Sequence, residues 1–384
     1  MRPSQPFRLG TVGGVAASLL ALSVGQTAAA PPAALITSTS ASPSAVTVAQ
    51  GQAARAVARS LGDGTWRARL QHAALASDEV AVTALARHDG RSRLTTMLAA
   101  ADRRIAAAKG LDAADVGPLL RLRLGDKTMR GALRAGTTPW VVPATAADDA
   151  TTAVAYDSRG RAHTIDARDT PSHPVYVIDI DSSKALDAGL GVLNDQFHRY
   201  GLASAAPAAQ QPPGAEALSG AGGFWSTRIS AVKLSDDKEP WVKGDAEIYT
   251  LVTGFGQDGK VRVDPVDMPY LDNEKTVYRP NQILVNWSYY KYNLADAVMM
   301  EEDGSTNYRD LAKAIATVLL TVTDQGTYIP LVNALLEAIP DNWWTDDPDY
   351  VDSWYTLAQS DKGTRYGARG NGWMTVEPYF VKQF

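Results

Sequence analysis

Hydrophobic positions in the first third of the chain repeat with the period of an α-helix. Five apolar side chains stand at i, i+3, i+4, i+7 and i+11: Leu94, Met97, Leu98, Ala101 and Ile105. This spacing places them on one face of a helix. Further helices are predicted over residues 53–61, 67–75 and 119–124. The pattern therefore predicts a helical domain over residues 48–135.

The period changes to that of a β-strand in residues 140–200. Residues 153–156 and 162–165 flank a turn that contains Gly160, which predicts a hairpin. Residues 174–181 form a β-branched run typical of a buried strand. We expect a small β unit here, followed by a linker over residues 202–223, where alanine, proline, glutamine, glycine and serine dominate.

Short apolar runs separated by turn residues recur in residues 224–384. They predict strands over residues 225–234, 246–255, 260–266, 283–287, 350–357 and 373–381. Helical spacing interrupts them at 307–340, first through Leu311, Ile315 and Leu319 and then through Leu331 and Leu335. The expected fold class is α+β: an N-terminal helical domain, a small β-hairpin unit, and a C-terminal β-sandwich with an α-helical hairpin insertion.

The first thirty residues predict a signal peptide. Arg2 and Arg8 precede a mild apolar run over residues 12–24, and alanines follow at 28–30. The chain has no cysteine, so we expect no lipid anchor, disulfide or thiolate-bound metal. No later stretch is long and apolar enough to span a membrane. We therefore expect a secreted protein.

Charge divides the chain into two regions. Residues 49–135 hold 15 basic and 8 acidic side chains, whereas residues 224–384 hold 15 basic and 24 acidic ones. Opposite charges joined by a flexible linker predict an intramolecular contact between the two regions. Acidic residues interrupt the basic ones, and aromatic residues are scarce between them, so we expect no nucleic-acid partner.

One stretch of the acidic region carries a family resemblance. Residues 239–249, Glu-Pro-Trp-Val-Lys-Gly-Asp-Ala-Glu-Ile-Tyr, resemble the signature of an uncharacterised family of exported bacterial proteins, a domain of unknown function. Residues 174–177 and the stretch from Asp349 to Val376 resemble the same kind of protein. The resemblance covers most of the chain after residue 30 and implies no particular activity.

The spacing of motif residues along the chain argues against several common kinds of active site. Residues 254–259 match G-x-G-x-x-G, but the strand-like residues 260–263 follow them, and a nucleotide site requires a helix there. We therefore interpret the motif as a hairpin turn and expect no nucleotide cofactor. The five histidines lack metal-binding spacing, and no G-x-S-x-G motif is present.

Two acidic clusters of the C-terminal region are the candidate functional site. We predict a Ca²⁺ site formed by Asp236, Asp237, Asp245, Asp347 and Asp349. Loops at one end of a sandwich can converge, and clustered carboxylates repel one another unless a cation neutralises them. The arrangement is similar to calcium-dependent C2-type sandwiches. The alternative is a solvated acidic surface whose aspartates form turns.

These observations leave two classes of function open. The first is a non-enzymatic secreted protein that binds an extracellular ligand or surface through its sandwich. The second is a carboxylate-dependent hydrolase acting on polysaccharide, in which Trp241, Trp343, Trp344 and Trp354 stack on sugar rings beside the acids. Stabilisation by Ca²⁺ favours the first class, and release of reducing sugar favours the second.

Overall fold

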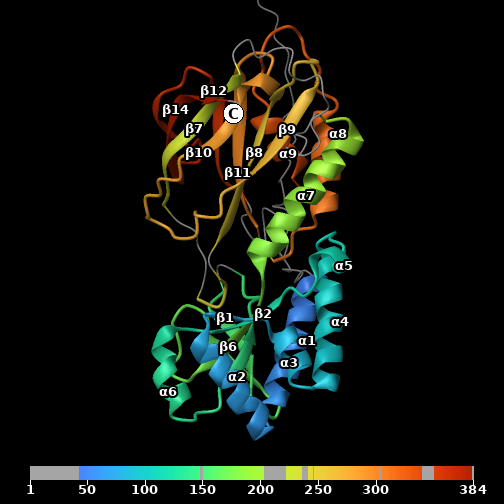
Figure 1. Cartoon of the computed structure of the whole chain (residues 1–384), viewed down its shortest axis with the longest axis vertical. Coiled ribbons are helices and arrows are strands. Elements are labelled where there is room, and N and C mark those ends of the chain that lie inside the picture. The colour runs from blue at the N-terminus through green and yellow to red at the C-terminus, as the bar shows by residue number, and fades with distance from the viewer. Residues whose placement is uncertain are drawn as a thin grey trace, which may run out of the picture. The chain divides into compact units, whose positions relative to one another are not determined.

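The helices predicted near the start of the chain are present in the computed structural model (Figure 1). The four longer ones are α1 (Ala45–Ser60), α2 (Gly64–Ala76), α3 (Val82–His88) and α4 (Ser92–Ala108). Ser44 and Asp63 cap the first two by accepting hydrogen bonds from backbone N–H groups. Of the predicted apolar face of α4, Leu98 and Ile105 are fully buried, whereas Met97 is 46% exposed. Two short helices follow, α5 (Ala113–Val116) and α6 (Arg130–Arg134).

The structure describes residues 43–147, 150–202, 222–235, 241–244, 246–302, 304–339 and 350–382. The predicted signal peptide at 1–30 and most of the predicted linker lie outside these ranges. The described residues from Pro43 onward belong to one compact unit. None of the helices in this part of the chain has the length and apolar character needed to cross a membrane.

A six-stranded sheet joins the predicted helical and β regions. Its order is β1-β2-β6-β3-β4-β5. The strands are β1 (Glu79–Val80), β2 (Leu120–Leu124), β3 (Trp140–Pro143), β4 (Thr152–Tyr156), β5 (Ala162–Asp166) and β6 (Val175–Ile180). The predicted hairpin is confirmed as β4 and β5, whereas the predicted helix over residues 119–124 is wrong, because that segment is β2. Leucines at 120, 122 and 124 alternate with arginines, which is the period of a strand.

Strand β2 pairs with β6, so residues 48–135 and 140–200 share one sheet. The domain boundaries themselves stay predictions. Strand β6 also pairs with β3, and this is the parallel pair of the sheet. The two strands therefore end at the same edge.

Helix α7 (Ser182–Tyr200) follows β6 directly, and the sequence pattern did not predict it. Asp181 caps its start, and Gly201, in the left-handed conformation, ends it. Gly189 interrupts the apolar pattern of this helix, because packing against a neighbouring helix requires a residue without a side chain here. A Cβ atom at this position would collide with the Tyr308 ring of the neighbouring helix α8 (Tyr308–Leu319).

The acidic region contains two four-stranded antiparallel sheets, in the orders β10-β7-β14-β13 and β12-β11-β8-β9. Their strands are β7 (Gly223–Leu234), β8 (Glu247–Phe255), β9 (Val261–Asp267), β10 (Gln282–Asn286), β11 (Leu294–Glu302), β12 (Tyr350–Ala358), β13 (Gly363–Tyr366) and β14 (Gly372–Lys382). The six predicted strands are confirmed, and residues 256–259 form the hairpin turn between β8 and β9. Strands β11 and β13 were missed, although β11 lies between β8 and β12.

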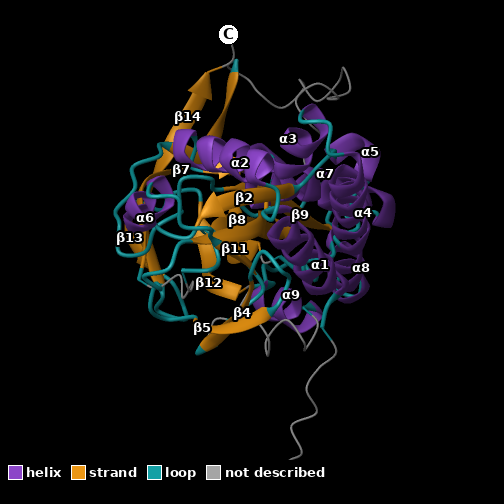
Figure 2. Ribbon diagram, turned by 90° about the horizontal axis from the view of Figure 1, so that it is seen from below, coloured by secondary structure: helices purple, strands orange, loops and turns teal. Residues whose placement is uncertain are grey.

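One apolar cluster contains side chains from both of these sheets. Ile229 and Val376 come from one sheet, and Val252, Ala297 and Trp354 come from the other. The predicted helical insertion is present as α8 and α9 (Val332–Ala338). Helix α8 packs on α7, and α9 packs on β11 and β12 (Figure 2). The chain is thus a mixed α+β protein with N-terminal helices and several antiparallel sheets.

Candidate functional site

The five carboxylates predicted to bind Ca²⁺ all lie outside the described residues. They are Asp236, Asp237, Asp245, Asp347 and Asp349. Within the described ranges, no group of three or more histidine, aspartate or glutamate side chains is arranged to hold a metal ion. The calcium site therefore stays a prediction.

Two of the four tryptophans predicted to stack on sugar are described; Trp354 is buried and Trp241 is half-buried. Trp354 is 3% exposed, and its indole N–H donates to the carbonyl of Arg365 at 3.1 Å. Trp241 packs against Gly125, and its indole N–H donates to the carbonyl of Asp166 at 3.4 Å. Their described contacts are those of structural side chains.

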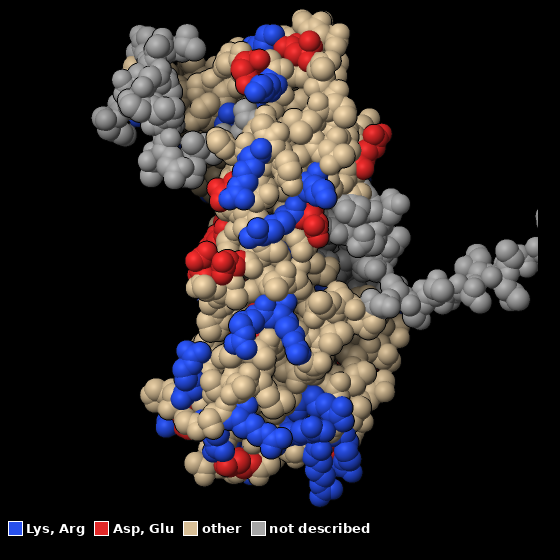
Figure 3. Space-filling model, turned by 90° about the vertical axis from the view of Figure 1, so that its right-hand side faces the viewer, with Lys and Arg blue, Asp and Glu red and all other residues tan. Residues whose placement is uncertain are grey.

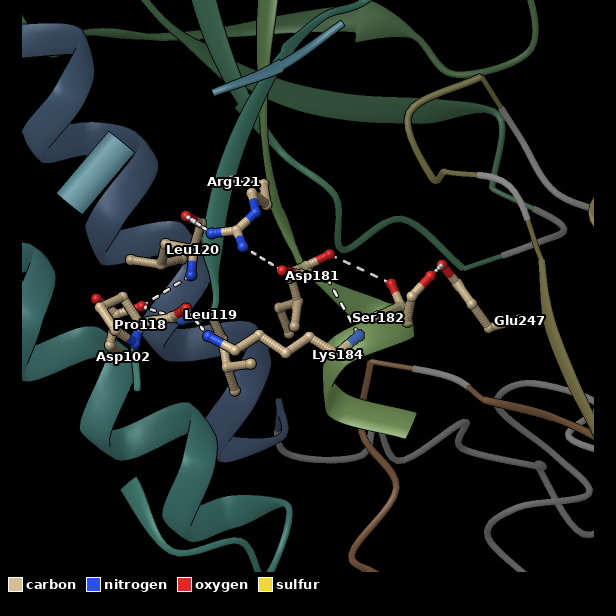
Figure 4. Close-up of polar contacts among 11 residues, drawn as sticks. Asp102, Pro118, Leu119, Leu120, Arg121, Asp181, Ser182, Lys184 and Glu247 are labelled. Carbon is tan, nitrogen blue, oxygen red and sulfur yellow. Dashed lines mark hydrogen bonds and ion pairs between the residues drawn. The ribbon is translucent and has the colours of Figure 1, made fainter. Parts of the chain in front are cut away.

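A pocket lies where the six-stranded sheet meets strands β8 and β11. The space between its walls, which includes open solvent, amounts to about 450 Å³. Its walls come from segments far apart in the sequence: Gln50, Lys109, Ala144, Asp179, Ile180, Ser182, Lys243, Gly244, Glu247, Glu301, Glu302 and Gly304. Figure 4 shows the Ser182 side chain at the start of α7 beside Glu247.

The topology of the sheet explains where the pocket forms. Ala144 follows β3, and Asp179 and Ile180 end the parallel strand β6. Ligand sites in sheets with parallel strands commonly lie beyond the carboxyl ends of those strands. The side chain of Asp181 accepts a hydrogen bond from the backbone N–H of Lys184 at 3.2 Å, so α7 begins at this edge. Its first turn brings Ser182 to the pocket wall.

Two glutamates face each other across the end of the neighbouring sheet. Glu247 begins β8, and Glu302, which ends β11, is its direct partner in the antiparallel register. Like charges at directly opposed positions repel. Glu302 is ion-paired with Lys109 and accepts a hydrogen bond from the hydroxyl of Tyr308. The Lys109 side chain has no exposed surface and the Glu302 side chain has 1%, so this is a buried ion pair.

The environment of Glu247 favours the protonated form of its side chain. Burial, followed by the charges of Glu302 and Asp179, raises the pKa of Glu247 from 4.5 to about 9. Hydrogen bonds from Ser182 and Ser183 oppose this rise, and the Ser183 hydroxyl donates to Oε1 at 3.3 Å. Glu247 is therefore a neutral carboxylic acid at pH 7.

Asp179 supplies the carboxylate on the opposite wall. Burial raises its pKa, and the Arg123 guanidinium, 3.4 Å away, opposes the rise. Arg123 also donates hydrogen bonds to the carbonyl groups of residues 241–243. This contact fixes the segment that carries Lys243 and Gly244 into the pocket wall.

Gln50 is the pocket residue whose polar group lacks a protein partner. It lies on α1 and is 3% exposed, and its side chain makes no hydrogen bond to any described residue. Its position in the pocket wall offers both a donor and an acceptor to a bound molecule.

The raised pKa of Glu247 predicts a dependence of stability on pH. The unfolded chain binds this proton with a pKa of 4.5 and the folded chain with a pKa of about 9. The stabilising contribution is therefore complete below pH 4.5 and is lost as the pH rises toward 9. Between pH 5 and 8 the unfolding free energy of the wild type should fall more steeply than that of Glu247→Gln, by about 1.4 kcal/mol per pH unit. Chemical denaturation at several pH values measures both slopes.

Glu274→Gln is the matched control, because its side chain is 37% exposed and pairs with Lys275 on the surface. It should keep the wild-type slope. Equal slopes for the wild type and Glu247→Gln would contradict the assignment of this proton.

Sequence reasoning assigned none of the pocket residues to a site, although one of them lies in a stretch that it singled out. Glu247 belongs to the stretch that carries the family resemblance. The end of β6 offered a weaker signal, since acidic residues at 179 and 181 close a β-branched run just before a pair of serines. Lys109, Gln50 and Glu302 gave no signal, because only the fold brings them together.

No curated protein matches this chain, and no solved structure matches it. A family model described as "Protein of unknown function (DUF3103)" does match, over residues 52–384. This confirms the resemblance to an uncharacterised family, and the matched range includes every residue of the pocket wall except Gln50. The chain therefore belongs to the DUF3103 family of proteins of unknown function.

Proposed function

We propose that this protein binds a small organic cation, whose ammonium or guanidinium group enters the pocket beside Glu247. The observation that carries the proposal is the pair formed by Glu247 and Glu302, directly opposed at the end of β8 and β11 and facing an enclosed space. Glu302 already has Lys109 as its counter-ion. Glu247 carries a proton. A ligand cation can take the place of this proton as the positive partner of the ionised carboxylate.

The composition of the pocket wall supports a cationic ligand. Four carboxyl side chains line it, at positions 179, 247, 301 and 302, against the two ammonium groups of Lys109 and Lys243. A cation that enters such a site favours the ionised form of a neighbouring carboxyl group. The Gln50 carbonyl can accept a hydrogen bond from the same ligand group.

Calorimetry with putrescine, agmatine and L-arginine as probes tests the proposal at pH 7.5. We expect binding of at least one probe to release close to one proton, measured from the heats in buffers of different ionisation enthalpy. Glu247→Gln should abolish the proton release and weaken binding at least tenfold. Gln50→Ala should weaken binding but keep the proton release.

Gln52→Ala is the matched control for Gln50, since Gln52 lies on the same helix and bonds to Arg104 at the surface. It should bind like the wild type. If none of the three probes binds at millimolar concentration, or if Glu247→Gln releases the same number of protons, the proposal is wrong.

The proposal retains three expectations from the sequence. Export rests on the signal-peptide pattern of residues 1–30. A β-sandwich is supported by the apolar cluster that the two four-stranded sheets share. A Ca²⁺ site at the acidic clusters near residues 236 and 349 rests on their composition and on the similarity to C2-type sandwiches.

Ca²⁺ therefore belongs in the probe set, and Ca²⁺ binding that Glu247→Gln leaves unchanged would favour those clusters over the pocket.

A carboxylate-dependent hydrolase is the second candidate. It is favoured by the proton on Glu247, because a half-buried carboxylic acid that is neutral at pH 7 can act as a general acid. Release of reducing sugar from a polysaccharide, lost in Glu247→Gln, would support this candidate over simple binding.

A further inference from the structure

We infer that the exposed arginine face of α1 and α4 binds the surface of a membrane containing anionic phospholipids. Five exposed arginines form this face: Arg55 and Arg59 on α1, and Arg93, Arg103 and Arg104 on α4. Figure 3 shows Lys and Arg side chains outnumbering Asp and Glu over the helical part of the chain on this side. The inference is independent of the pocket, since none of the five lines it.

The two helices run antiparallel and side by side. At one end Arg104 donates a hydrogen bond to Gln52 at 2.7 Å, and at the other Arg91, next to the start of α4, pairs with Asp63 at 2.6 Å. Positions 52, 55 and 59 share one side of α1, and positions 93, 97 and 104 share one side of α4. The guanidinium groups therefore lie along neighbouring helices rather than scattered around the molecule.

Little negative charge opposes them on these two helices. Helix α1 contains no acidic residue. The acidic residue of α4 is Asp102, which is 4% exposed and accepts hydrogen bonds from Thr83, Leu119 and Leu120 inside the protein. In the described part of the chain, Arg59, Arg93 and Arg103 form no ion pair. The face thus presents uncompensated positive charge, which is complementary to an anionic surface.

Two features favour a lipid surface over a nucleic acid. Guanidinium groups match the geometry of phosphate oxygens, which both partners offer. Val48 and Met97, however, are 44% and 46% exposed on the same two helices, and apolar side chains beside basic ones suit the boundary between headgroups and acyl chains. The nearby Trp66 is fully buried, so it provides no platform on which a base could stack.

Co-sedimentation of the full chain with vesicles tests this inference. Vesicles of phosphatidylcholine with 30% phosphatidylglycerol should bind the protein, and vesicles of phosphatidylcholine alone should not. The double variant Arg93→Glu/Arg104→Glu should lower the partition coefficient at least about twentyfold, since each basic residue near such a surface contributes roughly fivefold. At high salt the attraction between charges is screened, whereas the apolar contact remains. Under those conditions Met97→Ser should weaken the residual binding to the vesicles.

The control is Arg279→Glu/Lys313→Glu, which makes the same change of charge at exposed positions outside the two helices. It should retain most of the binding, and circular dichroism should show both double variants to be folded. Equal losses in the two double variants would overturn the inference. So would binding to a single-stranded oligonucleotide in the absence of any binding to the anionic vesicles.

Discussion

Lys109→Met should destabilise the protein by about 3–5 kcal/mol, because it removes one partner of the buried ion pair between Lys109 and Glu302. The Lys109 side chain is completely buried at the end of α4. The Tyr308 hydroxyl also donates to Glu302, but it is neutral and cannot balance a negative charge. Urea denaturation of the wild type and the variant measures the difference in unfolding free energy.

A double variant distinguishes the loss of the ion pair from a loss of packing. In Lys109→Met/Glu302→Gln a neutral amide replaces the carboxylate, so part of the lost stability should return relative to Lys109→Met alone. Lys127→Met is the control for the change of residue type, because Lys127 is exposed, and it should cost less than about 1 kcal/mol. A loss below about 1 kcal/mol in Lys109→Met would show that the pair does not hold this region together.

Asp352→Ala should cost about 4 kcal/mol, because one buried carboxylate organises a whole turn. Its Oδ1 accepts from the backbone N–H groups of Ser353 and Arg369, and its Oδ2 accepts from those of Asn371 and Gly372, each at 2.8 Å. A Cβ atom on Gly367 would collide with the same carboxylate, so the turn closes tightly around it. Alanine leaves all four N–H groups without this acceptor.

Asp352→Asn should have an intermediate effect of about 2 kcal/mol, since its amide keeps one oxygen and turns an NH₂ group toward the other pair of donors. Asp258→Asn is the control: this exposed aspartate accepts from the backbone N–H of Lys260 in a hairpin turn. It should change the unfolding free energy by less than about 1 kcal/mol. Thermal denaturation ranks the three variants, and an alanine variant as stable as the wild type would contradict the role of Asp352.

Much of the fold could be predicted because the relevant signals are local. The apolar stripe of α4, the glycine turn between β4 and β5, and the alternation of Val261 and Val263 each identify an element within about ten residues. Two of the missed elements, β11 and α7, have sequences in which tertiary packing obscures the expected period. Strand β11 is buried from Ala295 to Met300, so its sequence lacks the polar alternation of a half-exposed strand. Helix α7 carries glycines at 189 and 191, and the first of these is explained by the Tyr308 ring packed against it.

The candidate site was less accessible to sequence reasoning than the fold. Glu247 lies in the stretch that carries the family resemblance, but its raised pKa depends on burial in the fold, on Glu302, 55 positions later in the numbering, and on Asp179 in another sheet. The acidic clusters favoured by composition lie outside the described residues, whereas the acids of the pocket come from three separate segments of the chain.

By itself, the amino-acid sequence determined the mixed α+β class, most of the helices and strands, the contrast in charge between its two ends and the resemblance to an uncharacterised family. These properties follow from local periodicity and composition. Only the tertiary structure decided that β2 joins the sheet of β6, that Glu247 faces Glu302, and that Lys109 is buried against it. Strand pairing and desolvation are set by contacts between distant segments, and those contacts exist only once the chain has folded.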